Sequence, residues 1–116
     1  MMKILVSDPI TESGMAVLNE AKFEVVNLPK GTPEEKTDAC KDVHGWIIRS
    51  GTKITEDMIA SAEKLQAIGR AGVGVDNIAI PAATRRGIVV MNTPDVNTIS
   101  AAEHTVAMML TLSRNI

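Results

Sequence analysis

Short apolar runs alternate along the chain with segments whose apolar residues recur at helical spacing. The apolar runs are continuous, which is typical of strands buried on both faces of a parallel sheet. Five strands are predicted: Lys3–Ser7, Phe23–Leu28, Gly45–Arg49, Leu65–Ala71 and Ile88–Met91. The segments with helical spacing between them are Thr11–Lys22, Thr32–Val43, Thr55–Leu65 and Ile80–Gly87. This order predicts an α/β fold with a five-stranded parallel sheet and helices on both of its faces.

Residues that start and stop helices fall at the ends of the predicted helices. Thr32 and Thr55 stand where an N-cap is needed, because a hydroxyl oxygen accepts from the unpaired N–H groups of a first turn. Pro33 follows Thr32 at the position where proline is best tolerated, and Gly87 closes the helix before the last strand. With right-handed crossovers, the elements predict a flavodoxin-like arrangement.

The last predicted element, Thr98–Ile116, is a helix that is apolar almost all round. Such a helix needs burial on most of its sides, and a small sheet covers only part of it. We expect one unit over residues 1–97 and, over residues 98–116, a helix that leads to a second domain missing from this chain. The alternative is a terminal helix whose apolar face pairs with another copy of the chain.

Composition and charge narrow the possible partners. The formal net charge of -2 gives no reason to expect nucleic acid or an anionic membrane as a partner. No apolar run reaches the roughly 20 residues that span a bilayer. Cys40 is the only cysteine and is expected to be an ordinary thiol, and the two histidines, His44 and His104, are too far apart to suggest a metal site. Together these features favour a cytoplasmic protein.

Charged and small residues follow the carboxyl ends of the predicted strands, where parallel α/β sheets bind ligands. Arg49 and Arg70 provide two fixed positive charges there. Gly72 and Gly74 leave the backbone N–H groups of a turn open to an anion. Neutral hydrogen-bonding side chains occur in the same loops: Ser50, Asn92 and Asn97. Because guanidinium groups and open amides form strong bonds to anions, the pattern predicts a site for a small carboxylate or phosphate.

The turn after the fourth strand is glycine-rich but differs from a dinucleotide-binding loop. That loop requires G-x-G-x-x-G with its third glycine inside a helix, whereas Asn77 stands at the third position here. The next predicted helix begins near Ile80, too late to direct its N-terminus at a pyrophosphate. The turn is therefore expected either to hold a smaller anion or only to reverse the chain. A separate alternative is that Arg49 is a surface residue paired with a glutamate.

Four segments, in their order and spacing, resemble the amino-terminal part of D-2-hydroxyacid dehydrogenases: RSGTKIT, GRAGVGVDNI, GIVVMNTP and NTISAAEHTVAMMLTLSR. The resemblance covers essentially the whole chain and is strongest to members that oxidise 3-phosphoglycerate in serine biosynthesis. It implies an oxidoreductase in which a base removes the hydroxyl proton of a small anionic 2-hydroxy acid while hydride passes to NAD. It also implies that residues 1–97 form the substrate-binding domain and that residues 98–116 cross to a nucleotide-binding domain.

The resemblance implies roles for particular residues. Those implied to bind substrate are Arg49, Ser50, Arg70, Gly72, Val73, Gly74 and Asn97. Arg49 and Ser50 are implied to contact the anionic end of the substrate, with assistance from Arg70. Val73 is also implied to touch the nicotinamide end of the cofactor.

No catalytic residue is expected in this chain, because the family's catalytic histidine, its glutamate partner and its dinucleotide fingerprint lie in the later domain. Glu103 and His104 are adjacent within the predicted last helix, and both are expected to be structural. Alone, the chain is therefore expected to show negligible turnover.

Two other functions match parts of the pattern. A signalling receiver has the same alternating elements, but it needs clustered acids after the first strand and an aspartate after the third, where this chain has only Asp8 and Arg49. A non-enzymatic ligand sensor or co-repressor related to the dehydrogenases would keep the binding residues and lack the later histidine. Lactate, glycerate and glyoxylate also fit as substrates, and we expect a homo-oligomer.

Overall fold

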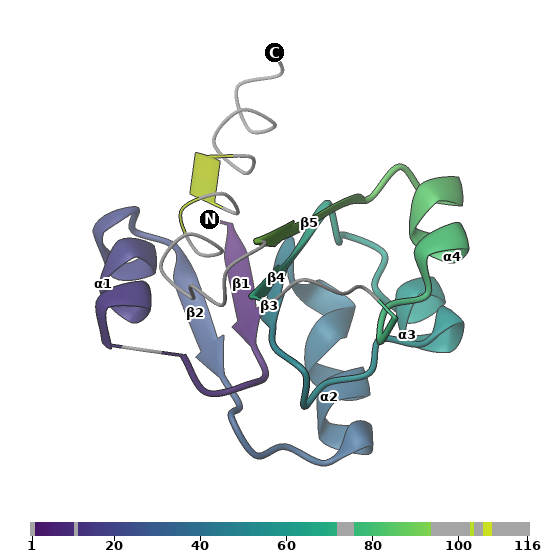
Figure 1. The fold of residues 1–116 in the computed structure, drawn as a ribbon, viewed down its shortest axis with the longest axis horizontal. Helices are drawn as coiled ribbons and strands as arrows, with labels where there is room; N and C mark the ends of the chain where they lie inside the picture. Colours follow the sequence, from purple (N-terminus) through teal and green to yellow (C-terminus); the bar gives the residue numbers. More distant parts are fainter. Residues whose placement is uncertain (1, 11, 72–75, 94–102, 104–105, 108–116) are drawn as a thin grey trace.

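The computed structural model describes residues 2–10, 12–71, 76–93, 103, 106 and 107. Its strands are β1 (Lys3–Val6), β2 (Glu24–Asn27), β3 (Gly45–Ile48), β4 (Ala67–Ala71) and β5 (Val89–Thr93). Its helices are α1 (Glu12–Glu20), α2 (Pro33–Ala39), the 3-10 turn η1 (Cys40–Asp42), α3 (Glu56–Ser61) and α4 (Ile80–Arg85). All strand pairs are parallel, in the order β2-β1-β3-β4-β5 (Figure 1). This order is the flavodoxin-like one, so the predicted sheet is confirmed.

Helices cover both faces of the sheet, as predicted. On one side of the sheet lies α1, and on the other lie α2, α3 and α4 (Figure 1). The alternation of side chains along each strand follows this division, because Ile47 packs on the α1 side while its neighbours Trp46 and Ile48 pack beneath the other three helices. All three side chains are fully buried. Because helices cover both faces of the sheet, side chains that point to either face are buried, which explains the continuous apolar runs in the strands.

The predicted helix caps are present. The Thr32 hydroxyl accepts from the N–H of Glu35 at 3.2 Å, and the Glu35 carboxylate accepts from the N–H of Thr32 at 3.0 Å, which forms a capping box at the start of α2. The Thr55 hydroxyl accepts from the N–H of Met58 at 3.2 Å at the start of α3. Gly87 follows α4 with φ of 71°, a conformation that glycine adopts without strain.

Several element ends differ from the prediction. The last strand reaches Thr93 rather than Met91, because its backbone continues to pair with β4. The helix α3 ends at Ser61 rather than Leu65, since Ala62 already leaves helical geometry. The predicted second helix is divided into α2 and η1, which begins at Cys40. Helix ends depend on contacts with other elements, which a local pattern does not reveal.

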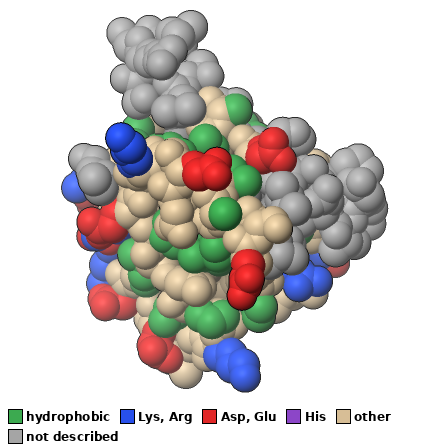
Figure 2. Space-filling view, turned by 90° about the vertical axis from the view of Figure 1, so that its left-hand side faces the viewer, with side chains coloured by type: hydrophobic (Ala, Val, Ile, Leu, Met, Phe, Trp, Pro, Cys, Tyr) green, Lys and Arg blue, Asp and Glu red, His purple; other side chains and the backbone are tan. Residues whose placement is uncertain are grey.

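Most of the predicted terminal helix, residues 98–116, lies outside the described residues. The three positions within it that are described, Glu103, Val106 and Ala107, are helical. Val106 packs against the apolar cluster that contains Ile4 and Leu18, which places this part of the chain on the α1 side of the sheet. Figure 2 shows that side of the molecule, where acidic and basic side chains are interspersed with small groups of hydrophobic ones. The predicted boundary at residue 97 stays a prediction.

Candidate functional site

The carboxyl ends of all the parallel strands meet at one edge of the sheet, and several of the predicted site residues lie there. Arg49 and Ser50 come directly after β3, while Arg70 is the last but one residue of β4. The backbone register pairs Arg70 with Ile48 on one side and with Asn92 on the other. The two arginines therefore stand on neighbouring strands at the same edge.

Arg49 is half-buried and is held by the segment that follows β1. Its backbone N–H donates to the Asp8 carboxylate at 2.6 Å, and its guanidinium Nη1 donates to the backbone carbonyl of Pro9 at 3.3 Å. Ser50 is exposed at the tip of the same loop. A guanidinium carries five N–H donors, so a single bond to Pro9 leaves capacity for an anionic ligand.

Asp8 is a residue of this edge whose role the sequence did not reveal. Asp8 is only 4% exposed, and its carboxylate faces two positions of the β3–α3 loop, Arg49 and Gly51. A Cβ atom on Gly51 would lie 2.5 Å from the Asp8 carboxylate oxygen Oδ1, closer than real Cβ contacts allow. Glycine at position 51 thus allows the loop to pack against a buried carboxylate that also fixes Arg49.

Hydroxyl groups connect β1, β3 and the β3–α3 loop beneath this edge. The indole N–H of Trp46 donates to the Ser7 hydroxyl at 2.8 Å, and the Ser7 and Thr52 hydroxyl oxygens lie 2.8 Å apart. The Thr52 hydroxyl donates to the backbone carbonyl of Ser7 at 3.4 Å, so the Ser7 hydroxyl is left to donate to Thr52. Every buried hydroxyl in this group then both donates and accepts.

Asn77 ties two loops of the edge together. Its side-chain amide donates to the backbone carbonyls of Arg49 at 3.0 Å and Thr52 at 2.6 Å. The backbone carbonyl of Asn77 accepts from the N–H of Ile54 at 2.8 Å, next to a parallel bridge between Ile54 and Ile78. Asn77 therefore has a structural role in fixing the β3–α3 loop.

The remaining predicted site residues lie outside the described part of the chain: Gly72, Val73, Gly74 and Asn97. Their roles, including contact of Val73 with a nicotinamide, stay predictions. Glu103 is described and exposed, while its neighbour His104 is not described.

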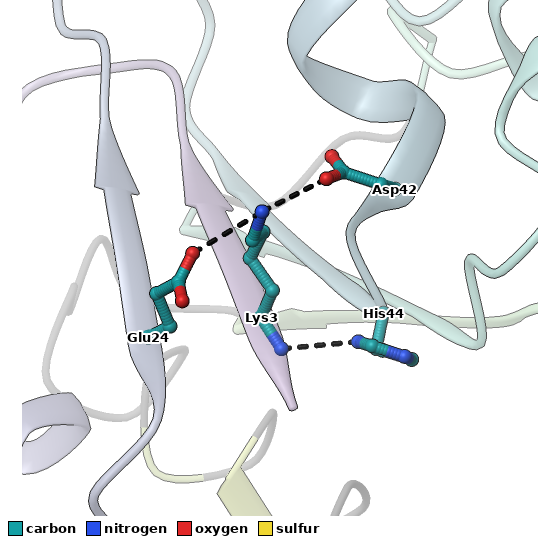
Figure 3. Close-up of polar contacts among 4 residues, drawn as sticks. All are labelled: Lys3, Glu24, Asp42 and His44. Atoms are coloured by element: carbon teal, nitrogen blue, oxygen red, sulfur yellow. Dashed lines mark hydrogen bonds and ion pairs between the residues drawn. The ribbon is translucent and has the colours of Figure 1, made fainter. Parts of the chain in front are cut away.

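Three groups with shifted pKa values, Lys3, Asp42 and His44, lie at the opposite edge of the sheet (Figure 3). Lys3 at the start of β1 forms ion pairs with Asp42 at 2.8 Å and Glu24 at 3.1 Å, and these carboxylates raise the pKa of Lys3. The hydrogen bond from Lys3 lowers the pKa of Asp42. His44 accepts from the backbone N–H of Lys3 at 3.0 Å through Nδ1, and burial, aided by the charge of Lys64, lowers the pKa of His44.

The thiol of Cys40, which was expected to be an ordinary one, is buried under α3. It donates to the backbone carbonyl of Thr37 at 3.2 Å, and burial raises its pKa to about 11. A thiol in this state is a poor nucleophile. Over the described residues, no three or more His, Cys, Asp or Glu side chains are grouped to hold a metal ion. In that same part of the chain, no helix has the length and apolarity needed to cross a membrane.

Residues 4–114 match the family model described as D-isomer specific 2-hydroxyacid dehydrogenase, catalytic domain. The chain belongs to this family. The match to D-2-hydroxyacid dehydrogenases confirms the resemblance seen in the four motifs and overturns the alternative of a signalling receiver.

This member of the D-2-hydroxyacid dehydrogenase family is similar to the following two curated relatives and one solved structure. D-3-phosphoglycerate dehydrogenase of Methanocaldococcus jannaschii is 51% identical over 116 residues, which are 100% of this chain and 22% of that protein. The Homo sapiens D-3-phosphoglycerate dehydrogenase is 46% identical over 114 residues, or 98% of this chain and 21% of that protein. The NAD+-bound 3-phosphoglycerate dehydrogenase of Entamoeba histolytica has a TM-score of 0.72 and 41% identity, over 80% of this chain and 33% of that one. The chain thus spans about a fifth of the length of these curated relatives.

Proposed function

We propose that this chain is the substrate-binding part of an NAD-dependent D-3-phosphoglycerate dehydrogenase. The observation that carries the proposal is the 51% identity to one such enzyme across the whole chain. The position of Arg49 and Arg70 on adjacent strands at one edge supports it, because 3-phosphoglycerate carries a carboxylate and a phosphate. Two fixed guanidinium groups suit a doubly anionic substrate.

The part of this chain in the reaction is to hold and orient the substrate. Arg49 and Ser50 bind one anionic end, and Arg70 assists at the neighbouring strand. The amides of Gly72, Val73 and Gly74, together with Asn97, complete the contact with the carboxylate. Orientation of this kind removes the entropic cost of assembling the reactants at the moment of reaction. Closure of the edge against the rest of the enzyme excludes water.

NAD is the proposed cofactor of the whole enzyme, and when bound it accepts the hydride from the substrate carbon that bears the hydroxyl. The chain contains no G-x-G-x-x-G sequence, and the described parts of its strand-to-helix loops carry only isolated glycines, Gly31 after β2 and Gly51 after β3. These loops do not fit a pyrophosphate. We therefore infer that NAD is held mainly by residues beyond this chain, with Val73 contacting only its nicotinamide end.

We further propose a homo-oligomeric, cytoplasmic enzyme. The buried, unpaired thiol of Cys40 suits a compartment that keeps thiols reduced. Sedimentation of the full-length protein at several concentrations measures the assembly, and a monomer at micromolar concentration would contradict it.

The test is the steady-state kinetics of the full-length protein, with NADH formation followed by absorbance at increasing 3-phosphoglycerate. Replacing Arg49 with Ala removes a charged hydrogen bond to the substrate, so KM is expected to rise by about 10- to 100-fold. Arg85→Ala is the matched control, because Arg85 lies on the outer side of α4 in an exposed ion pair with Glu56 and is expected to leave KM unchanged. The 116-residue chain alone is expected to form no NADH.

Three outcomes would contradict the proposal. Equal KM values for Arg49→Ala and the unaltered enzyme would remove Arg49 from the site. NADH formation by the short chain alone would place the cofactor here. A full-length protein that binds 3-phosphoglycerate without turnover would instead support the ligand-sensing alternative.

A further inference from the structure

A cavity of about 240 Å³ lies between α2 and α3, beside the loop that follows β3. Its lining residues come from these two helices and from the loop: Pro33, Lys36, Gly51, Lys53, Thr55 and Met58. In Figure 1 the two helices lie on the face of the sheet opposite to α1. The cavity is large enough for a small metabolite, since a single water molecule occupies about 30 Å³ in the liquid.

Lys36 places a buried positive charge in the wall of this cavity. The residue is only 8% exposed, and its ammonium group donates one long hydrogen bond, 3.4 Å, to the backbone carbonyl of Gly51. No carboxylate of the described residues lies within ion-pair distance of it. A buried charge is costly unless an opposite charge or several hydrogen bonds compensate it. An anion in the cavity would compensate the charge of Lys36, for which the described residues supply no carboxylate.

Pro33 and Met58 make part of the cavity wall apolar, and its polar side chains are those of Lys36, Lys53 and Thr55. Lys53 adds a second ammonium group, and the Thr55 hydroxyl, which accepts from the N–H of Met58, has its hydrogen available to donate. Among the carboxylates in the first turns of the two helices, Glu35 bonds to the N–H of Thr32 and Glu56 pairs with Arg85, while Glu34 and Asp57 are exposed. Two ammonium groups and a hydroxyl suit a group with several acceptor oxygens and a charge near −2.

We propose that this cavity is a binding site for a phosphate group, carried either by inorganic phosphate or by a small phosphate monoester. Lys36 and Lys53 hold the phosphate oxygens. The Gly51 peptide links the cavity to the loop of Arg49, because its carbonyl accepts from Lys36 while its α-carbon packs against Asp8. Phosphate in the cavity draws the Lys36 ammonium group toward it and thereby acts on this loop. The proposed phosphate site is inferred from the residues around the cavity alone, so it does not depend on which hydroxy acid is the substrate of the enzyme.

The test is calorimetric titration of the full-length protein with inorganic phosphate. Lys36→Met keeps most of the length of the side chain and removes the charged ammonium group, so affinity is expected to fall by about 10- to 100-fold. Lys53→Gln changes an exposed position that does not bear on folding, and a loss of about three- to tenfold is expected. Lys64→Gln, an exposed lysine before β4, is the control with the same change in net charge. Arg49→Ala is expected to leave the affinity for phosphate at this cavity unchanged, although it impairs the proposed dehydrogenase.

A second measurement reports on the site itself. Bound phosphate is expected to slow the acetylation of Lys53 by an amine-reactive reagent, as followed by mass spectrometry, and to leave Lys64 unaffected. Protection at lower concentrations of 3-phosphoglycerate than of inorganic phosphate identifies a monoester as the ligand, and the reverse order identifies free phosphate. Equal protection of both lysines, unchanged affinity in Lys36→Met, or protection by glycerate, which lacks phosphate, would overturn the assignment.

Discussion

The carboxylate of Asp8 is buried at the end of β1 and has two contacts across the loop that follows β3. One oxygen accepts from the N–H of Arg49 at 2.6 Å, and the other lies where a side chain at position 51 would have to fit. The carboxylate cannot move away from position 51 without weakening its bond to Arg49. The backbone beside the proposed substrate arginine is thus set by one buried carboxylate and one glycine.

Replacing Gly51 with Ala is therefore expected to destabilise the chain by about 1–3 kcal/mol, because a Cβ atom would overlap the Asp8 carboxylate. Urea unfolding followed by the fluorescence of Trp46, the only tryptophan, measures this change. The cost is expected to be much smaller in a background of Asp8→Ala, which removes the overlap. Gly87→Ala is the control, since Gly87 has no atom near its missing Cβ and its cost should not depend on position 8. Additive effects of Asp8→Ala and Gly51→Ala would contradict this explanation.

At the scale of elements, Arg86 joins α4 to the end of α3 through its guanidinium group. The Arg86 guanidinium follows α4 and donates to the backbone carbonyls of Ile59, Ala62 at 3.1 Å and Glu63 at 3.3 Å. Two of these carbonyls also accept a backbone N–H, since Ile59 accepts from Ala62 and Ala62 accepts from Leu65. At this end of α3 the helix dipole favours a positive charge. Arg86 therefore acts as the C-terminal cap of a neighbouring helix.

Arg86→Met is expected to lower the free energy of unfolding by about 1–2 kcal/mol, because it removes the hydrogen bonds of a charged donor to the end of α3. Arg86→Lys should recover only part of the loss, since an ammonium group lacks the planar fork of a guanidinium. Arg85→Met is the matched control: its ion pair with Glu56 joins side chains that are 62% and 72% exposed, and such pairs contribute at most about 1 kcal/mol. Equal losses for Arg85→Met and Arg86→Met in urea unfolding would show that the cap has no special role.

The sequence predicted the features that depend on local patterns. The parallel sheet, the capping role of Thr32 and the turn at Gly87 all follow from short stretches of chain, and the structure confirms them. The contact of Asp8 with Arg49 joins residues 41 positions apart, and no local pattern indicates it. The same holds for the buried state of Lys36, because a lysine in a polar helix gives no sign that its ammonium group faces a cavity.

At the scale of the whole molecule, the two edges of the sheet have different roles. The carboxyl edge carries Arg49, Arg70 and the loop around Gly51, while the amino edge carries the cluster of Lys3, Glu24, Asp42 and His44 (Figure 3). The cluster links β1, β2 and the start of β3 through ion pairs and hydrogen bonds. Ionisation at the amino edge is therefore expected to change the stability of the sheet without direct contact with a ligand at the opposite edge.

His44 makes this expectation testable. Its Nδ1 must be unprotonated to accept from the N–H of Lys3, and burial holds its pKa below the ordinary value of 6.5. As the pH falls, His44 is therefore protonated in the unfolded chain before it is protonated in the folded chain. The contribution of His44 to the free energy of unfolding is fully present above pH 6.5 and declines until the pH passes below the folded pKa. His44→Asn keeps an acceptor for Lys3 and removes the titration, so urea unfolding between pH 7 and pH 5 should show a shallower decline than in the unaltered chain. Asp42 does not interfere in this range, since its lowered pKa acts below 3.8. His44→Ala should lose stability at every pH, and an unchanged pH dependence in His44→Asn would assign the decline to another group.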